Sequence, residues 1–303
     1  MRKTIAALHS RKETQMSMKL SSRQVDGLQS GNGGQPGAAE RPKARPSAGM
    51  RKVKRLGWNL LPPLTFVAII AIWAAVVRLF DIPAYVMPGP GLVFSRLVEE
   101  YPQLWSNSIV TVTEIVWGFG LTIVTAIPVG LVIALSPLAK QVVYPPLMFL
   151  QLVPKIAVAP LFLVWLGFGI ESKVLLTVLM TFFPLLLASV SGFQILDNRL
   201  LYLTQSMGAS SWQTFRYLRL PAALPVIFSG IKTSATIAAT AAIVAEFVGA
   251  NKGLGYVLLR GTSTMDIGLT FAVIAVLTFI GIAINYIVEF AEWAMTPWQR
   301  NKN

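Results

Sequence analysis

The chain has no cysteine and a single histidine, and these absences exclude several kinds of chemistry. Without cysteine there can be no disulfide, no thiol nucleophile and no thiolate metal ligand. The only histidine, His9, lies near the amino terminus, which argues against a histidine metal site or a Ser-His-Asp triad. We therefore expect no catalytic residues and no metal site.

Charge is also scarce. Only 13% of the residues are charged, whereas soluble domains usually carry about a quarter. Hydrophobic residues make up 54% of the chain, and its mean hydropathy is +0.61. This balance favours a protein that lies mostly in the lipid bilayer over a soluble domain.

The charges that are present are unevenly distributed. Residues 1–55 hold 13 Lys and Arg against three acidic residues, so they account for most of the net charge of +13. A basic segment directly before an apolar span is typical of a cytoplasmic flank, and we expect no nucleic-acid partner. Residues 26–49 are also rich in Gly, Pro and Ser. Residues 1–56 are therefore predicted to be a disordered tail, followed by a transmembrane domain over 57–303.

Six apolar runs are each close to the roughly 20 residues that cross a bilayer as a helix. In chain order they cover residues 60–80, 109–135, 144–166, 174–190, 225–248 and 269–288. The predicted fold class is therefore all-α, a multi-pass membrane protein with six transmembrane helices. With the amino terminus inside, the inner segments carry far more Lys and Arg than the outer ones, so both termini are expected in the cytoplasm.

The third span contains four prolines, which leave carbonyl groups without helical partners. In lipid this is tolerated where other helices or a water-filled path satisfy them. Pro154 and Pro160 are therefore candidates for lining a translocation pathway, although an ordinary kinked helix explains them equally well. After the Pro-Gly cluster of the first outer loop, helical spacing over residues 92–100 predicts a short interfacial helix.

Three ionisable residues in the spans are candidates for the same pathway. Lys155 could contact an anion or simply reach the inner interface. Glu114 lies near the outer face, where a structural role is the simpler interpretation. Glu246 could act at a gate or pair with Lys252. The nearby Gly253-Leu254-Gly255 is interpreted as a turn, because no Lys-Ser follows it as in a phosphate-binding loop.

The inner loop between the fourth and fifth spans carries the most informative pattern. Residues 200–207 can form a short helix that Gly208 ends, since glycine accepts the left-handed conformation. Ser210 and Gln213 have the spacing of a capping box and can start a second helix, which Pro221 would end near Leu220. Trp212 and Phe215, with Leu218 or Arg219 one turn on, would project from it for a protein partner to bind.

This loop resembles the cytoplasmic coupling loop of permeases from binding-protein-dependent ABC importers. The matching residues are Gly208, Ala209, Ser210, Trp212, Phe215, Leu218, Leu220 and Pro221. The family's Glu-Ala-Ala is absent, since residues 202–204 are Tyr-Leu-Thr. The resemblance extends over about residues 57–298, with a core transmembrane domain of about 105–290. It is strongest to the branch that serves nitrate, sulfonates, taurine and pyrimidine-type vitamin precursors, in segments 87–93, 153–173, 182–193, 244–258 and 296–298.

The resemblance implies a permease homodimer in the bacterial inner membrane. A dimer of cytoplasmic ABC ATPase subunits would dock on the loops, and a periplasmic or lipid-tethered binding protein would deliver a small solute. ATP would be bound by the partner subunit, so this chain would need no cofactor of its own.

Two other classes of function remain open. A stand-alone secondary transporter or channel would need an ion or proton relay, and the spans show neither this nor an internal repeat. A membrane-embedded enzyme would need a polar catalytic cluster, which the chain lacks. Since no phosphate-binding loop is present either, the coupling energy is expected to come from a separate ATPase.

Overall fold

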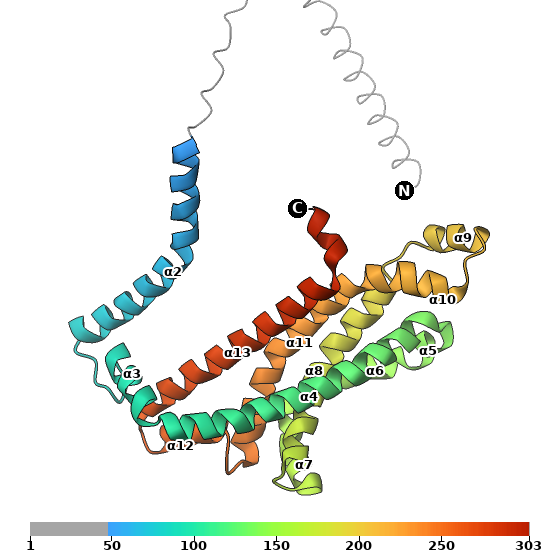
Figure 1. Ribbon diagram of the computed structural model, residues 1–303. Coiled ribbons are helices and arrows are strands. Elements are labelled where there is room, and N and C mark those ends of the chain that lie inside the picture. Colours follow the sequence, from blue (N-terminus) through green and yellow to red (C-terminus); the bar gives the residue numbers. More distant parts are fainter. Residues whose placement is uncertain (1–47, 303) are drawn as a thin grey trace, which may run out of the picture. The chain divides into compact units, whose positions relative to one another are not determined.

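The computed structural model describes the backbone of residues 48–302 and the side chains of residues 64–299 (Figure 1). Most of the predicted basic tail, residues 1–47, lies outside the described residues. The tail's last residues belong to α2 (Ala48–Leu79), so the boundary predicted at residue 56 falls within this helix. The chain divides into two compact units, Met1–Pro62 and Pro63–Asn303, and the second holds every helix from α3 onward.

All regular elements among the described residues are helical, as the composition predicts. After α2 they are α3 (Pro90–Glu99), α4 (Tyr101–Leu135), α5 (Pro137–Val142), α6 (Tyr144–Gln151), α7 (Lys155–Leu166), α8 (Ile170–Phe193), α9 (Asn198–Ser206), α10 (Ser211–Thr214), the π-helical turn η1 (Phe215–Arg219), α11 (Leu220–Gly249), α12 (Leu254–Ser263), α13 (Ile267–Met295) and the 3₁₀ helix η2 (Pro297–Lys302). The helix predicted after the first Pro-Gly cluster is α3, which has Pro90 in its first turn.

Four of these helices are long and apolar enough to cross a membrane. They are α4, α8, α13 and the continuous 39-residue helix Ser211–Gly249, and they confirm the second, fourth, fifth and sixth predicted spans as helices. A bent pair of helices can form a fifth. Within the described side chains, α2 has a shorter apolar stretch, Leu64–Leu79, so six spans remain a prediction.

The third predicted span is not one continuous helix. The segment Pro137–Gln151 and the helix Lys155–Leu166 meet at an angle of 94°. Pro154 is the reason: it has an extended backbone (ψ 92°) directly before α7, and a proline disfavours helical geometry in the residue that precedes it. The sequence therefore locates the interruption, but the structure makes it a sharp bend instead of a mild kink.

The fifth span corrects a second expectation about proline. The sequence predicts that the helix starting at Ser211 ends near Leu220, but the chain remains helical through Pro221. The π-helical turn η1 lies just before it, and the N–H of Leu220 bonds to the carbonyl of Phe215, five residues back. A widened turn of this kind gives the proline ring room and changes the carbonyl pattern, so the helix does not break.

Helix α8 packs between α4 and α11, and small residues bring their backbones close. A Cβ atom added at Gly118 or Gly130 would lie 2.6 Å from side chains of α8, and one at Gly230 would lie 2.2 Å from Ala188. Close approach at small residues is the usual way in which membrane helices associate. A buried apolar cluster that includes Leu185 and Ile227 fills the space around these contacts.

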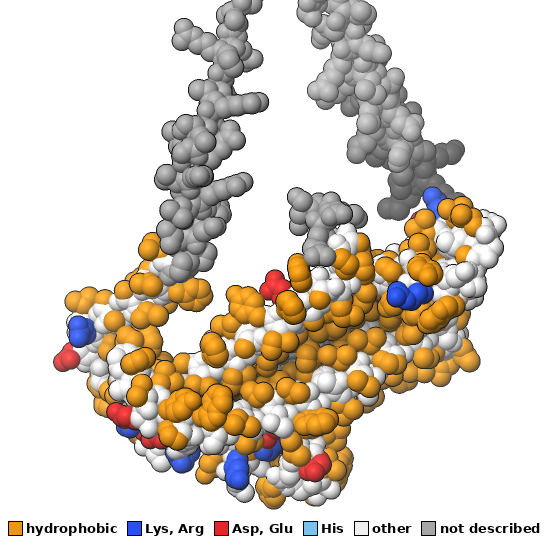
Figure 2. All heavy atoms as spheres, viewed as in Figure 1, with side chains coloured by type: hydrophobic (Ala, Val, Ile, Leu, Met, Phe, Trp, Pro, Cys, Tyr) orange, Lys and Arg blue, Asp and Glu red, His pale blue; other side chains and the backbone are white. Residues whose placement is uncertain are grey.

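Polar and apolar side chains are separated along the helices of the second unit. Figure 2 shows hydrophobic side chains over much of the visible face of the long helices, with most of the visible Lys, Arg, Asp and Glu near the helix ends. One end carries α9 and α10, and the opposite end carries α12 (Figure 1). These two ends hold most of the candidate functional residues.

Candidate functional site

The segment that joins α8 to α11 folds as the sequence predicts up to residue 214. Asp197 caps α9 by accepting a hydrogen bond from the backbone N–H of Arg199. Gly208 follows α9 with φ +77°, a left-handed conformation that favours glycine. Its N–H donates to the carbonyl of Gln205, and the N–H of Ala209 donates to that of Thr204. Gly208 thus turns the chain from α9 into α10, as expected.

The predicted capping box is present at the start of α10. The hydroxyl of Ser210 accepts a hydrogen bond from the N–H of Gln213 at 3.2 Å, and the Gln213 side chain accepts one from the N–H of Ser210 at 2.8 Å. Two N–H groups that would otherwise lack helical partners are satisfied in this way. The segment Asn198–Arg219 is called the α9–α10 loop below.

The α9–α10 loop exposes large apolar side chains. Trp212 is 69% exposed and Tyr217 is 76% exposed. Phe215 behaves differently: it is half-buried, stacks with Trp212 at 5.8 Å between ring centroids and lies 6.3 Å from Phe193 of α8. Phe215 therefore fixes the loop to the helix core, and Trp212 projects from it. Of the other predicted docking residues, Leu218, Leu220 and Pro221 are half-buried.

Two hollows flank this loop. One, of about 450 Å³, is lined by Trp212, Phe215 and the α4 residues Leu131 and Leu135, among others. The other, of about 470 Å³, includes Gly208, Met207, Tyr217 and Leu218 in its lining. Exposed aromatics beside concave apolar surfaces suit a protein partner. Tyr217 was not selected by sequence reasoning, although it lies five residues after Trp212 in the same exposed segment.

Lys155 lies at the bend between α6 and α7. Its ammonium donates to the carbonyl of Gln151 at 3.0 Å and lies 5.3 Å from the ring centroid of Phe183. A cation at a helix carboxyl end is electrostatically favourable, so Lys155 helps to hold the bend. Pro154, directly before α7, and Pro160, within α7, are both exposed. A pathway role for these three residues stays a prediction.

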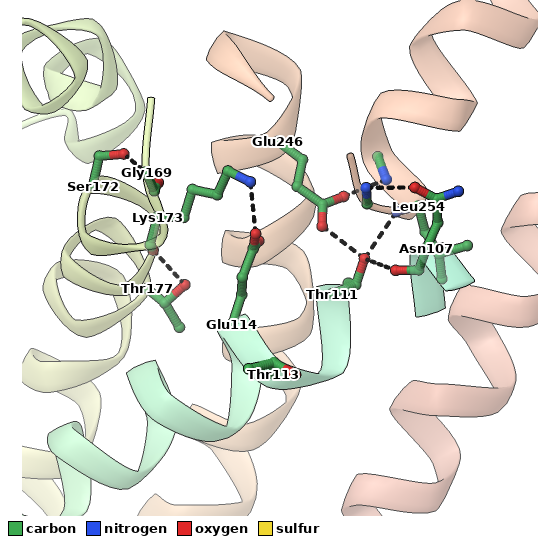
Figure 3. A network of polar contacts seen from close by, with 12 residues as sticks. Asn107, Thr111, Thr113, Glu114, Gly169, Ser172, Lys173, Thr177, Glu246 and Leu254 are labelled. Carbon is green, nitrogen blue, oxygen red and sulfur yellow. Dashed lines mark hydrogen bonds and ion pairs between the residues drawn. The ribbon is translucent and has the colours of Figure 1, made fainter. Parts of the chain in front are cut away.

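The opposite end holds a buried polar network, which joins α4, α8, α11 and α12 (Figure 3). Lys173 donates to Oε1 of Glu114 at 2.6 Å, and both side chains are more than nine-tenths buried. Sequence reasoning placed Lys173 only at a span end and gave it no role. The two residues lie 59 positions apart, so no local pattern indicates the pair.

Glu246 forms the other half of this network. Its carboxylate accepts hydrogen bonds from the hydroxyl of Thr111 at 2.6 Å and from the N–H of Gly255. The N–H of Leu254 in turn donates to Thr111 at 2.8 Å, and the N–H of Gly253 donates to Asn107 at 2.7 Å. We call these residues, with Glu114 and Lys173, the carboxylate cluster.

The carboxylate cluster changes two predictions. Glu246 does not pair with Lys252, which is exposed: no such ion pair occurs among the described side chains. The glycine segment is also more than a turn, because α12 begins at Leu254, directly after Gly253 with φ +110°. A buried carboxylate at a helix amino terminus is stabilised by the N–H groups and dipole there. The cluster therefore ties three spanning helices to α12.

No group of side chains in the described part of the chain has the arrangement of a metal site. The fold combines helices long enough to span a membrane, a loop with exposed apolar side chains at one end and a buried, hydrogen-bonded polar network at the other. The chain belongs to the family of inner-membrane components of binding-protein-dependent transport systems, whose family model matches residues 126–300.

Its relatives are permeases of such transporters. The riboflavin transport system permease RibX of Chloroflexus aurantiacus is 33% identical over 85% of this chain and 97% of its own length. The formylaminopyrimidine transport permease ThiX of Halalkalibacterium halodurans is 32% identical over 82% of this chain and 100% of its own. The putative aliphatic sulfonates permease SsuC of Bacillus subtilis is 30% identical over 87% and 97%. The chain is thus an ABC transporter permease, a transport component and not an enzyme.

Proposed function

We propose that the chain forms the translocation pathway of an ABC importer. The α9–α10 loop would couple the pathway to a partner protein, and α2 would contribute a sixth span. A separate cytoplasmic ATPase would dock on the loop, and a solute-binding protein would deliver the solute from the other side. The membership of a binding-protein-dependent family supports both partners. ATP-driven movement of the ATPase would then be passed to α11, because the loop continues into this helix through η1.

The observation that carries the docking role is the exposure of Trp212 beside a well-ordered turn. The capping box and Gly208 hold the loop in one conformation, so little entropy would be lost when a partner binds. The large exposed ring then supplies the apolar area that interface hot spots use. On this assignment the α9–α10 end is cytoplasmic, as are both termini, and the α12 end faces outward.

A second copy of the chain would complete the pathway. Five or six spans enclose little space by themselves, and homodimers with closed symmetry are the commonest assembly. The solutes named for the relatives are riboflavin, formylaminopyrimidine and aliphatic sulfonates. We propose that this chain carries a small organic solute of one of these kinds.

The docking role can be tested by co-purification. The chain would be co-expressed with the ATPase subunit encoded beside it and purified in mild detergent through a tag on the chain. Gly208→Val should abolish recovery of the ATPase, because a β-branched residue is strongly strained at φ +77°. Gly208→Asn is the matched control, since Asn tolerates this conformation.

The controls separate folding from docking. An added Cβ at Gly208 meets no atom of a neighbouring element within 4 Å, so the strain of Gly208→Val is confined to the local backbone and both variants should insert in the membrane. Normal ATPase recovery and normal uptake with Gly208→Val would rule out the loop as the coupling site. Solute flux in liposomes that contain this chain alone would instead support a stand-alone transporter or channel.

A further inference from the structure

The exposed face of α11 differs from those of α4 and α13. Exposed residues on α4 and α13 include large apolar side chains such as Val116, Val124, Phe279 and Ile282. Between residues 220 and 246, α11 exposes no large apolar side chain. Its exposed residues there are Ser229, Thr233, Thr236 and Thr240. They recur every three or four residues, so they form one face about 16 Å long.

Hydroxyl groups alone do not require water. Thr233 donates to the carbonyl of Ser229 and Thr236 to that of Lys232, so both are satisfied within the helix. The decisive observation is what lies beside them on α13. Lys232 forms an ion pair with Glu292, and the Thr236 hydroxyl donates to Oδ1 of Asn285 at 3.4 Å.

The ion pair is partly exposed and lies toward the end of α13, since Glu292 is three residues before its last residue, whereas Asn285 lies within the predicted sixth span. The side chain of Lys232 is 39% exposed and that of Glu292 is 20% exposed. Charged and amide groups within membrane helices usually face a bundle interior or a water-filled cavity, because desolvating them is costly. We call Lys232, Thr236, Asn285 and Glu292 the α11–α13 seam, and the four exposed hydroxyl residues extend it along α11.

We propose that the α11–α13 seam and its hydroxyl face are the surface that the solute contacts during passage, and that they suit a solute with several hydrogen-bonding groups and no net charge. This inference rests on the proposed function, since it assigns part of the translocation pathway. It favours a riboflavin- or pyrimidine-like solute over an anionic sulfonate. Lys155, the earlier candidate for an anion contact, lies at the start of α7 and is bonded to the carbonyl of Gln151, the last residue of α6.

The preference for an uncharged solute follows from the charge balance. Lys232 is the one basic residue of α11 between residues 220 and 249, and Glu292 neutralises it. What remains along α11 are hydroxyl groups, beside the amide of Asn285, and these donate and accept hydrogen bonds without selecting a charge. The exposed carboxylate of Glu289, one turn from Asn285 on α13, adds a negative charge that disfavours anions. A surface for anions would instead present an unpaired Lys or Arg.

The absence of cysteine makes the seam directly testable. Single cysteines at Thr233 and Thr236 would be introduced in the transporter complex in liposomes and treated with charged methanethiosulfonate reagents. Only a thiol in contact with water ionises and reacts quickly. We expect both positions to react at least about tenfold faster than the exposed apolar controls Val124→Cys and Ile287→Cys. Ile287 lies two residues from Asn285 on the other side of α13, so it matches the depth of the seam without belonging to it.

The charge preference is tested at the same thiol. With the ion pair intact, Thr236→Cys should react with anionic and cationic reagents in their free-solution ratio. Adding Glu292→Gln, which leaves Lys232 unpaired, should raise the anionic-to-cationic ratio by about tenfold, and adding Lys232→Gln should lower it. A purely structural ion pair would leave the ratio unchanged in both variants.

Two outcomes would overturn the inference. Unreactive cysteines at Thr233 and Thr236 would mean that the face meets lipid or is closed against another subunit. A strong preference for one reagent charge with the pair intact would exclude an uncharged solute. ATPase co-purification separates the two proposals. If the ATPase is recovered while the thiols stay unreactive, the seam does not contact the solute, but the proposed docking of an ATPase on the α9–α10 loop stands.

Discussion

The two ends of the permease have inverted surfaces. At the α12 end, charged and polar groups are buried: Glu114, Lys173 and Glu246 are almost inaccessible, and each has partners from a different element. At the α9–α10 end, apolar groups are exposed, and the side chains of Trp212 and Tyr217 project from the surface. Each end therefore breaks the usual rule that apolar residues are inside and polar residues outside.

The inversion indicates what each end does. A buried network in which most groups are hydrogen-bonded stiffens a structure, because moving any one member leaves another unsatisfied. In the carboxylate cluster, Oε2 of Glu114 is buried without a hydrogen-bond partner among the described residues, and the other carboxylate oxygens are bonded. An exposed aromatic ring on a fixed turn contributes little to the stability of the isolated chain and much to an interface. We infer that the α12 end holds the helices rigidly together. We infer that the α9–α10 end is where movement of the ATPase is transmitted to the permease. Substitutions at the first end should change stability, and substitutions at the second should change association.

The largest effect is expected from Lys173→Met. Removing the ammonium leaves Glu114 buried without its cation, which should lower the free energy of unfolding by about 3–5 kcal/mol. Thermal unfolding in detergent measures this. The exposed Lys252→Met is the control and should change stability by less than about 0.5 kcal/mol.

A double variant sharpens this prediction. When Glu114→Met accompanies Lys173→Met, both charges are gone, and most of the lost stability should return. If Lys173→Met alone unfolds at the temperature of the unsubstituted chain, the cluster is not a rigid tie and the comparison of the two ends fails.

Gly255→Ala should have the next largest effect. The added Cβ would lie 2.7 Å from Oε2 of Glu246 and 2.9 Å from the carbonyl of Ile243, so the backbone of α12 must move. Overpacking of this kind costs about 1–3 kcal/mol, visible in the same unfolding measurement. Gly120→Ala meets nothing within 4 Å and should stabilise α4 slightly. Equal stability of the two variants would contradict the packing at Glu246.

Trp212→Ala should separate the two ends most clearly. The ring is exposed, so the unfolding temperature should hardly change. Binding of the ATPase to the purified permease should weaken by about 2 kcal/mol, roughly 30-fold in Kd. Trp165→Ala, on the equally exposed ring of α7, is the control. An equal loss of affinity in both variants would show that the effect is not specific to the loop.

Local chemistry was the part of this molecule that sequence could predict. The turn at Gly208 and the capping box of Ser210 and Gln213 depend on residues within a few positions of one another. The long helices follow from run length and hydropathy in the same way. Proline was harder: Pro154 breaks a span and Pro221 does not, because the outcome depends on the π-helical turn before Pro221.

Long-range pairing could not be predicted. Glu246 suggested Lys252 as a partner because it lies nearby in sequence, whereas its real partner on α4 is Thr111, 135 residues away. Lys173 and the seam pair Lys232–Glu292 were set aside or missed for the same reason. A single sequence does not show which residues far apart in the chain are brought together by tertiary packing. Those contacts decide whether a charged residue stabilises the fold or is free to act on a solute or partner.

Ser210→Ala should have the smallest effect, and it tests whether order in the loop matters by itself. The substitution removes one cap of α10 while Trp212 remains in place, which costs about 1 kcal/mol of local helix stability. If docking requires the ordered loop, ATPase affinity should fall by about fivefold with no change in global unfolding. Ser210→Asp keeps a capping oxygen and should retain the affinity, and Ser206→Ala, which removes a hydroxyl bonded only within α9, should do the same. Full affinity in Ser210→Ala would mean that the ATPase orders the loop on binding, so that rigidity would belong to the carboxylate cluster alone.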